Sequence, residues 1–467
     1  MHQAQSPIRQ PIIGLFTLTM LSVSAIIALR NLPMMALHGF SSLFFYAFAA
    51  LLFFIPVSLA CAELASGWPK EGGVYAWVKE AFGEKAGALA IWFEWIESVV
   101  WLPTVLSFIA ATSAYLINPA LAQNRYFLLA VMLTVLWSGT FINFLGMKTS
   151  SLVSSLGIMF GSLIPGTLIV MLAIAWLVAG NLPAIGLTTQ DLIPSMNLET
   201  LVFFTGILLS FAGMEVSAFH VRDTKDPQRA YPKAAFLAAG IIITIYALGS
   251  LSIALVVPKA SISLTAGVMQ AFEFFFHALN LPWAVPVLAF LLLIGALALV
   301  NTWIIGPSRG LLTSALNNDM PDFAKRTNRI GTPVAILLMQ ATISTLLAFT
   351  FLFLPSVNSS YWLLTVLASQ LILIMYFLIF LSVIRLRYTQ PNTVRAYQIP
   401  GGKIGVWLIA GTGAVASVLT FLIGFVPAGE FEFGGRATYT TILLFGIVLT
   451  ATPPFFWQWQ KHKKTKT

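Results

Sequence analysis

Four charged residues lie inside long apolar stretches of the sequence, where charge is costly: Arg30, Glu94, Glu97 and Glu215. A carboxylate in such a place can carry a proton or pair with a cation, and a guanidinium can hold a carboxylate through two parallel hydrogen bonds. Glu94 and Glu97 are three residues apart, so a helix presents them on one face. These residues predict ion pairing, ligand binding or proton transfer in an apolar interior.

The composition shows what kind of interior this is. Hydrophobic residues make up 58% of the 467 residues and charged residues only 9%, whereas a soluble domain carries roughly 25% charged residues. Charge-free stretches such as 31–62 and 331–384 exceed the length of about 20 residues that a helix needs to cross the hydrocarbon core. Backbone polar groups cannot remain unpaired there, so the stretches must be helical. The predicted fold class is an all-α, polytopic membrane protein.

Turn signals and charges divide the apolar runs into about twelve spans, an even number that places both termini on one side. The expected limits are 11–36, 40–65, 87–117, 126–146, 150–179, 200–220, 234–257, 283–316, 333–354, 361–387, 404–426 and 438–459.

The net charge of +9 follows this division. If the termini and every second loop are cytoplasmic, only Arg125, Lys259 and Arg436 of the 25 Lys and Arg residues lie on the other side, and Arg30 lies within a span. Cytoplasmic loops are enriched in Lys and Arg. The sequence therefore predicts a multi-pass membrane protein with both termini in the cytoplasm. The basic balance does not indicate a nucleic-acid partner.

Two spans are interrupted near their midpoints, at Ser22-Val23-Ser24-Ala25 in the first and at Ser210-Phe211-Ala212-Gly213 in the sixth. Amphipathic loops at 72–82 and 263–279 also recur five spans apart, which would place them on opposite sides of the membrane. Interrupted spans at matching places in two halves are typical of inverted-repeat transporters with a site at the bilayer midplane. Small residues also permit close helix packing, which is the structural alternative.

Five sequence strings, in their order along the chain, resemble the amino acid–polyamine–organocation superfamily and, within it, the bacterial glutamate/γ-aminobutyrate antiporters. The strings are Glu71-Gly72-Gly73-Val74-Tyr75-Ala76-Trp77-Val78, Gly213-Met214-Glu215-Val216-Ser217-Ala218, Ala266-Gly267-Val268-Met269-Gln270, Trp303-Ile304-Ile305-Gly306-Pro307-Ser308-Arg309-Gly310 and Ile399-Pro400-Gly401-Gly402-Lys403. The resemblance implies a LeuT-type core of two inverted five-helix repeats in 1–390, with spans one and six broken. Residues 391–467 would add two helices and a short basic cytoplasmic tail.

The resemblance also implies that backbone amides and carbonyls freed at the two breaks hold the substrate, in keeping with the charge preferences of helix ends. Glu215 matches a family glutamate and is expected to carry a coupling proton, or else to pair with Arg30 or a backbone amide. Trp303 and Tyr376 are expected to be walls or gates of the site, or simply core aromatics. The complete set of expected substrate-binding residues is Ser22, Val23, Ser24, Ala25, Arg30, Ser210, Phe211, Gly213, Glu215, Trp303 and Tyr376.

Arg30 is a departure from the resembling antiporters, which have a tyrosine at this position. Its charge needs a negative partner, because an unpaired buried charge is strongly destabilising. Either Arg30 faces the site and binds a substrate carboxylate, or it pairs permanently with Glu94, Glu97 or Glu215. The second arrangement would leave a nearly neutral site lined by Leu299 and Ile372, and the apolar character of those two residues favours it slightly.

The predicted function is amino acid antiport by alternating access, in which amino acids, or an amino acid and its decarboxylated amine, are exchanged. A proton- or sodium-coupled amino acid permease is the alternative, because exchange depends on how fast the empty carrier reorients. Neither an HExxH motif nor a Gly-rich phosphate loop is present, so no enzyme activity, cofactor or metal is expected. Expected partners are amino acids and the lipid bilayer, and the protein is expected to be a monomer or a homodimer.

Overall fold

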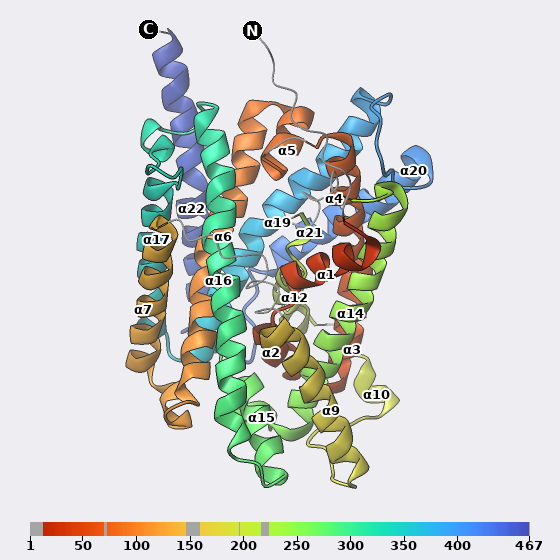
Figure 1. Cartoon of the computed structure of the whole chain (residues 1–467), viewed down its shortest axis with the longest axis vertical. Coiled ribbons are helices and arrows are strands. Elements are labelled where there is room, and N and C mark those ends of the chain that lie inside the picture. The colour runs from red at the N-terminus through yellow and green to blue at the C-terminus, as the bar shows by residue number, and fades with distance from the viewer. Residues whose placement is uncertain (1–12, 70–71, 146–158, 196, 216–223, 467) are drawn as a thin grey trace.

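Helices form all the regular secondary structure in the computed structural model, which describes residues 13–69, 72–145, 159–195, 197–215 and 224–466 (Figure 1). The first half of the chain contains α1 (Leu15–Ile26), α2 (Leu32–Ala36), α3 (Ser42–Ala49), α4 (Ile55–Gly67), α5 (Val74–Phe82), α6 (Glu84–Ala114), α7 (Arg125–Phe144), α9 (Ile164–Val178), α10 (Thr189–Leu192), α11 (Leu198–Leu201) and α12 (Phe204–Ser210). The second half contains α14 (Pro227–Val256), α15 (Gly267–Ala278), α16 (Ala284–Leu316), α17 (Val334–Ala348), α18 (Thr350–Phe353), α19 (Val357–Thr389), α20 (Gly402–Val406), α21 (Thr412–Ile423) and α22 (Arg436–Lys466).

Ten helical stretches in the described residues are long and apolar enough to cross a membrane. They are Gly39–Gly67, Glu84–Ala114, Arg125–Phe144, Met159–Val178, Arg229–Val256, Ala284–Leu316, Val334–Phe353, Val357–Thr389, Gly402–Ile423 and Arg436–Gln458. The bent pair Leu15–Ile26 and Leu29–Ala36 is an eleventh, with an angle of 49° between its parts. The sixth expected span, 200–220, is represented by the shorter apolar helix Leu198–Ser210, and its end at 216–220 lies outside the described residues. The predicted all-α membrane architecture is confirmed.

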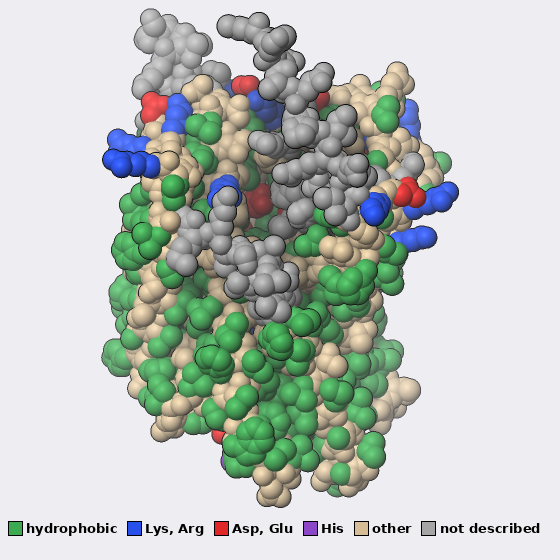
Figure 2. All heavy atoms as spheres, in the orientation of Figure 1, with side chains coloured by type: hydrophobic (Ala, Val, Ile, Leu, Met, Phe, Trp, Pro, Cys, Tyr) green, Lys and Arg blue, Asp and Glu red, His purple; other side chains and the backbone are tan. Residues whose placement is uncertain are grey.

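Burial separates the central helices from the peripheral ones. The apolar window of α6 is 94% buried and that of α19 is 78% buried, whereas the window of α22 is 11% buried. α6 packs against α19, α16 and α5, so it lies at the centre of the bundle. Hydrophobic side chains cover much of the surface in Figure 2, and Lys and Arg gather near the end where α5 lies. The molecule thus presents an apolar belt to lipid and keeps α6, with Glu94 and Glu97, inside.

The two predicted amphipathic segments form helices at opposite ends of the molecule. α5 lies near the upper end of Figure 1 and α15 lies at the lower end. This placement agrees with the expectation that the two segments occupy equivalent positions in halves of opposite orientation. The division into a core of 1–390 and an addition of 391–467 stays a prediction.

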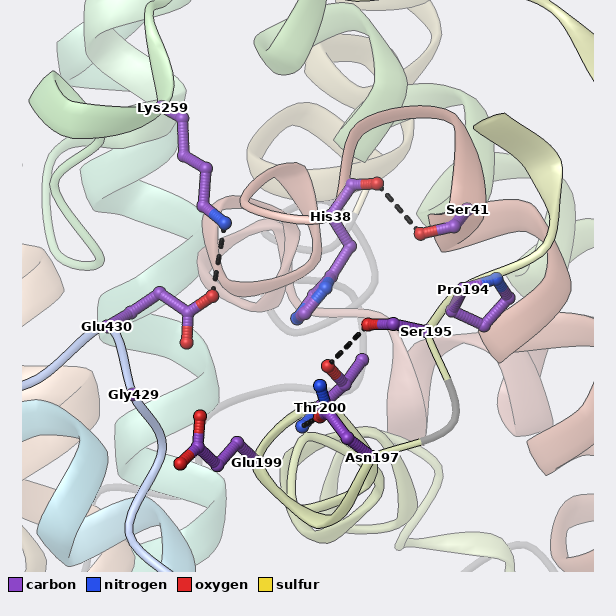
Figure 3. A pocket seen from close by; sticks show the side chains of 10 residues that line it. All are labelled: His38, Ser41, Pro194, Ser195, Asn197, Glu199, Thr200, Lys259, Gly429 and Glu430. Atoms are coloured by element: carbon purple, nitrogen blue, oxygen red, sulfur yellow. Dashed lines mark hydrogen bonds and ion pairs between the residues drawn. The ribbon is translucent and has the colours of Figure 1, made fainter. Parts of the chain in front are cut away.

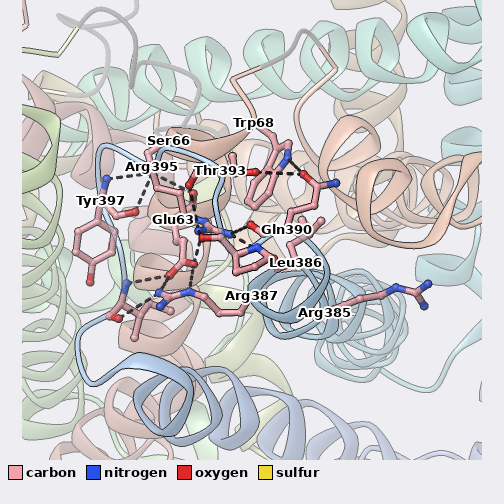
Figure 4. Close-up of polar contacts among 12 residues, drawn as sticks. Glu63, Ser66, Trp68, Arg385, Leu386, Arg387, Gln390, Thr393, Arg395 and Tyr397 are labelled. Carbon is pink, nitrogen blue, oxygen red and sulfur yellow. Dashed lines mark hydrogen bonds and ion pairs between the residues drawn. The ribbon is translucent and has the colours of Figure 1, made fainter.

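A buried cluster of charges holds together the end of the bundle near α5 (Figure 4). Glu63 in α4 has 1% of its side chain exposed and accepts a hydrogen bond from Nε of Arg387, at the end of α19, at 2.6 Å. Nε of Arg395 lies 3.5 Å from the same Glu63 oxygen, and the Ile399 amide donates to the other oxygen at 2.9 Å. One carboxylate therefore joins α4, α19 and the segment before α20.

Neighbouring side chains complete this contact. The Ser66 hydroxyl donates to the carbonyl of Tyr397 at 3.0 Å, and the Tyr397 amide donates back to it at 3.2 Å. The Arg395 guanidinium lies over the Trp68 ring, 5.0 Å from the ring centre. These contacts surround the charges with partners, so no charge in the cluster faces apolar surroundings alone.

We expect Glu63→Gln to destabilise the protein by about 3–5 kcal/mol, because it leaves two buried guanidinium groups without their shared carboxylate. Thermal unfolding of the purified protein in detergent, followed by loss of the monodisperse peak, measures the effect. Glu84→Gln is the matched control: Glu84 pairs with Lys79 at 3.2 Å but is 61% exposed, so its loss costs about 0–1 kcal/mol. Equal unfolding temperatures for the two variants would show that the cluster does not stabilise the fold.

Candidate functional site

The first break lies later in the chain than its small residues predicted. α1 continues through Ser22–Ala25 to Ile26, and the backbone is extended at Ile27 and Ala28 before the chain becomes helical again at Leu29. The Ser22 hydroxyl donates to the carbonyl of Leu18 at 3.0 Å, so it bonds within its own helix and does not interrupt it. Arg30 is consequently two residues beyond the break.

The second break is where the sequence placed it. α12 ends at Ser210, and Gly213 has a φ of +121°, a conformation that favours glycine. A Cβ atom on Gly213 would lie 2.8 Å from the carbonyl oxygen of Ala25. The two breaks are therefore in direct contact, and the glycine is required both by its backbone conformation and by the space available.

Two buried tyrosines bond to backbone groups that the breaks release. The Tyr246 hydroxyl, from α14, accepts from the Ala28 amide at 3.0 Å and donates to the Ile26 carbonyl at 2.8 Å. The Tyr376 hydroxyl, from α19, accepts from the Gly213 amide at 2.9 Å and donates to Oε2 of Glu215 at 2.6 Å. Each break is thus held open by one phenol, and Glu215 is attached to the second break through Tyr376.

A small cavity of about 30 Å³ lies between the two breaks. Its lining residues are Ala25, Ile26, Ala28, Arg30, Asn31, Glu97, Trp101, Leu209, Ser210, Ala212, Leu299 and Trp303. This volume is about that of one water molecule, far below the several hundred Å³ of a typical ligand pocket. Among the described residues, the space between the breaks is therefore too small for an amino acid, and its walls must move apart before one fits.

Five of the expected site residues line this cavity, namely Ala25, Arg30, Ser210, Glu97 and Trp303. The others do not line it, and all of them except the half-buried Ser24 are buried. Val23 and Ser24 remain in α1, where the Ser24 hydroxyl donates to the Leu21 carbonyl at 2.8 Å. Phe211 stacks on Phe54 with ring centres 4.9 Å apart. Ile372 is buried away from the cavity, so of the two apolar residues expected to line the site only Leu299 does so.

Arg30 is not held as the favoured arrangement predicted. Its Nη1 donates to the hydroxyls of Thr104 at 3.1 Å and Tyr361 at 3.0 Å, and its guanidinium lies over the Trp101 ring, 4.7 Å from the ring centre. Within the described residues it forms no ion pair with Glu94, Glu97 or Glu215, and its buried Nε has no hydrogen-bond partner. The Nε–Nη2 edge of Arg30 is therefore open for a carboxylate.

Sequence reasoning missed the residues that position Arg30. Trp101 and Thr104 lie four and seven residues after Glu97, a spacing that keeps them on the same face of α6. That spacing could have revealed them. Tyr246 and Tyr361 come from distant spans, and no local pattern distinguishes them from other aromatic residues of the core.

Comparison with known proteins identifies the family of the chain. Residues 13–449 match the family described as amino acid permease. An uncharacterized transporter of Legionella pneumophila is 43% identical, over 97% of this chain and 97% of its own. A glutamate/gamma-aminobutyrate antiporter of Lactococcus lactis is 32% identical, over 95% of this chain and 89% of its own. A probable agmatine/putrescine antiporter of the same species is 25% identical, over 78% of this chain and 77% of its own. The chain belongs to the amino acid permease family.

Proposed function

We propose that the protein is an amino acid antiporter that works by alternating access around the cavity between the two breaks. The observation that carries this proposal is the cavity itself, which is bounded by residues of both breaks and by Arg30, whose Nε has no hydrogen-bond partner. In inverted-repeat transporters the substrate binds at such broken helices, and one group of helices then rocks against the other. The names of the Lactococcus lactis relatives support exchange as the mode of transport.

The open edge of Arg30 supports an acidic amino acid and its decarboxylated product as the exchanged pair. Loss of the α-carboxylate from glutamate leaves γ-aminobutyrate, and both molecules keep the side-chain carboxylate. A guanidinium edge that binds this shared carboxylate would accept both substrates. Leu299, which lines the same cavity, offers an apolar surface to the methylene groups.

A proton-coupled amino acid permease is the second candidate function, and Glu97 is the observation that favours it. Its carboxylate lines the cavity and has no ion-pair partner among the described side chains. Buried carboxylates in membrane spans commonly serve as proton relays. Counterflow in proteoliposomes distinguishes the two functions, because an antiporter needs substrate on the far side and a symporter needs an ion gradient.

For the orientation, we propose a bacterial inner-membrane location in which α5 and the chain termini face the cytoplasm. The Lys and Arg residues gathered near that end support it (Figure 2), since cytoplasmic surfaces carry an excess of these residues.

Arg30→Met should raise the KM for glutamate and for γ-aminobutyrate about ten- to a hundredfold, the effect of losing a charged hydrogen-bonded contact. Exchange of both radiolabelled substrates in proteoliposomes measures it. Arg436→Met, which removes an exposed Arg outside the site, should leave both KM values unchanged. Normal glutamate exchange by Arg30→Met would exclude Arg30 from carboxylate recognition.

Glu215→Gln and Tyr376→Phe together separate a proton-carrying role of Glu215 from a structural one. Both variants weaken the hydrogen bond between the two side chains, so both should slow exchange severely while the protein still reaches the membrane. If Glu215 carries the coupling proton, only Glu215→Gln should also flatten the dependence of the transport rate on pH. A normal rate and a normal pH profile in Glu215→Gln would remove Glu215 from the mechanism.

Single cysteines test the orientation. Thr327 and Asn181 are both exposed, between α16 and α17 and after α9 respectively, and the native Cys61 is buried. In intact cells, a membrane-impermeant maleimide should label Asn181→Cys and not Thr327→Cys. The reverse pattern would invert the proposed orientation.

A further inference from the structure

A second, larger cavity lies at the end of the molecule opposite to α5. Its volume is about 410 Å³, within the range of small-molecule sites. It lies between His38 after α2, the residues Ser195, Asn197 and Glu199 around the start of α11, Lys259 after α14, and the loop at Gly429–Glu430 after α21 (Figure 3). The cavity therefore borders the end of α2, which follows the first break, and the start of α11, which leads into α12 and the second break.

Several polar groups of this outer cavity already have partners. Lys259 pairs with Glu430 at 3.1 Å. The hydroxyls of Ser195 and Thr200 bond to each other at 3.1 Å. Because these groups are bonded to each other, we assign them to the walls of the cavity and not to ligand binding.

Two groups have no such partner: a carboxylate, which accepts hydrogen bonds, and an imidazole nitrogen, which accepts when the proton is on the other ring nitrogen. The Glu199 carboxylate, next to Gly429, forms no ion pair with a described residue. The Nε2 atom of His38 is buried and has no hydrogen-bond partner. Burial lowers the pKa of His38 to about 4, against an opposing effect of Glu430, so the ring is neutral at pH 7 and one of its nitrogens accepts. With two carboxylates, one ammonium and a neutral imidazole, the cavity has a formal charge of −1.

We propose that this outer cavity binds the primary ammonium group of the transported amino acid or amine before the substrate reaches the cavity between the breaks. An ammonium group has three donors and a positive charge, which match the unpaired acceptors of Glu199 and His38. The inference rests on the proposed transport function for the identity of the ligand. Within the described residues no group of three or more His, Cys, Asp or Glu side chains could hold a metal ion.

An aromatic layer of Phe203, Trp362 and Phe431 lies beneath the outer cavity. The His38 ring meets Phe203 edge-on at 4.2 Å between ring centres, and Phe203 lies 4.7 Å from Trp362. Phe431 lies 5.4 Å from Trp362, and Phe203 and Trp362 are fully buried. A ligand beside His38 thus lies one ring contact away from this buried aromatic layer.

A protection experiment tests this site without relying on transport. Ser195→Cys places a thiol in the exposed wall of the outer cavity, and Cys61 is buried. γ-Aminobutyrate should slow modification of this thiol by a membrane-impermeant maleimide, whereas butyrate, which lacks the ammonium group, should not. Added Glu199→Gln should raise the half-protecting concentration about tenfold, the effect of losing one charged hydrogen bond. Added Glu432→Gln, an exposed carboxylate of the same loop that does not line the cavity, should leave it unchanged.

Three results would overturn the inference: equal protection by butyrate, equal protection by potassium ions, or full protection in the Glu199→Gln variant. Repeating the assay with Arg30→Met keeps it independent of the inner cavity, and loss of protection there would also contradict an outer site. The transport assay tests the proposed function on its own: if proteoliposomes exchange no amino acid while the thiol is still protected, antiport is wrong and the outer site remains.

Discussion

A backbone amide or carbonyl without a partner is expensive in an apolar interior, and this chain leaves helical geometry twice in the middle of its bundle. The tyrosines of α14 and α19 meet that cost, since the hydroxyls of Tyr246 and Tyr376 pair with groups that the breaks release. The contact between Gly213 and Ala25 then brings the breaks together. The central cavity exists only because this constraint is satisfied from outside the broken helices.

The same constraint governs the charge of Arg30. Two hydroxyls and an indole ring contact its guanidinium. These uncharged groups orient the guanidinium without neutralising it. A permanent ion pair with a carboxylate of the protein would have neutralised the charge of Arg30 without a ligand. Its hydrogen-bond partners are uncharged, and Glu97 lines the same cavity without an ion pair to it, so a ligand carboxylate can still bind the guanidinium directly.

The sequence predicted features that depend on local pattern, and missed those that depend on distant contacts. The helical spans follow from hydrophobic length, and the second break follows from Gly213. The first break was placed too early, because Ser22 and Ser24 bond back to their own helix and remain helical. The ion pair that was slightly favoured for Arg30 over binding of a substrate carboxylate is absent from the described residues for a different reason, because the partners of Arg30 are distant in the chain. Its partners, Thr104 and Tyr361, lie 74 and 331 residues away. The spacing on α6 relates Thr104 to Glu97, but nothing in it favours a hydroxyl over a glutamate as the partner of Arg30.

The charge cluster at Glu63 has a consequence for how the protein is made. Glu63 and Arg387 are 324 residues apart, and helices enter the membrane in the order of synthesis, at roughly 5–20 residues per second. The carboxylate on α4 therefore waits for its partner until α19 emerges. Closure of this end therefore comes late in assembly, and until α19 is in place Glu63 remains an acid without its Arg387 partner.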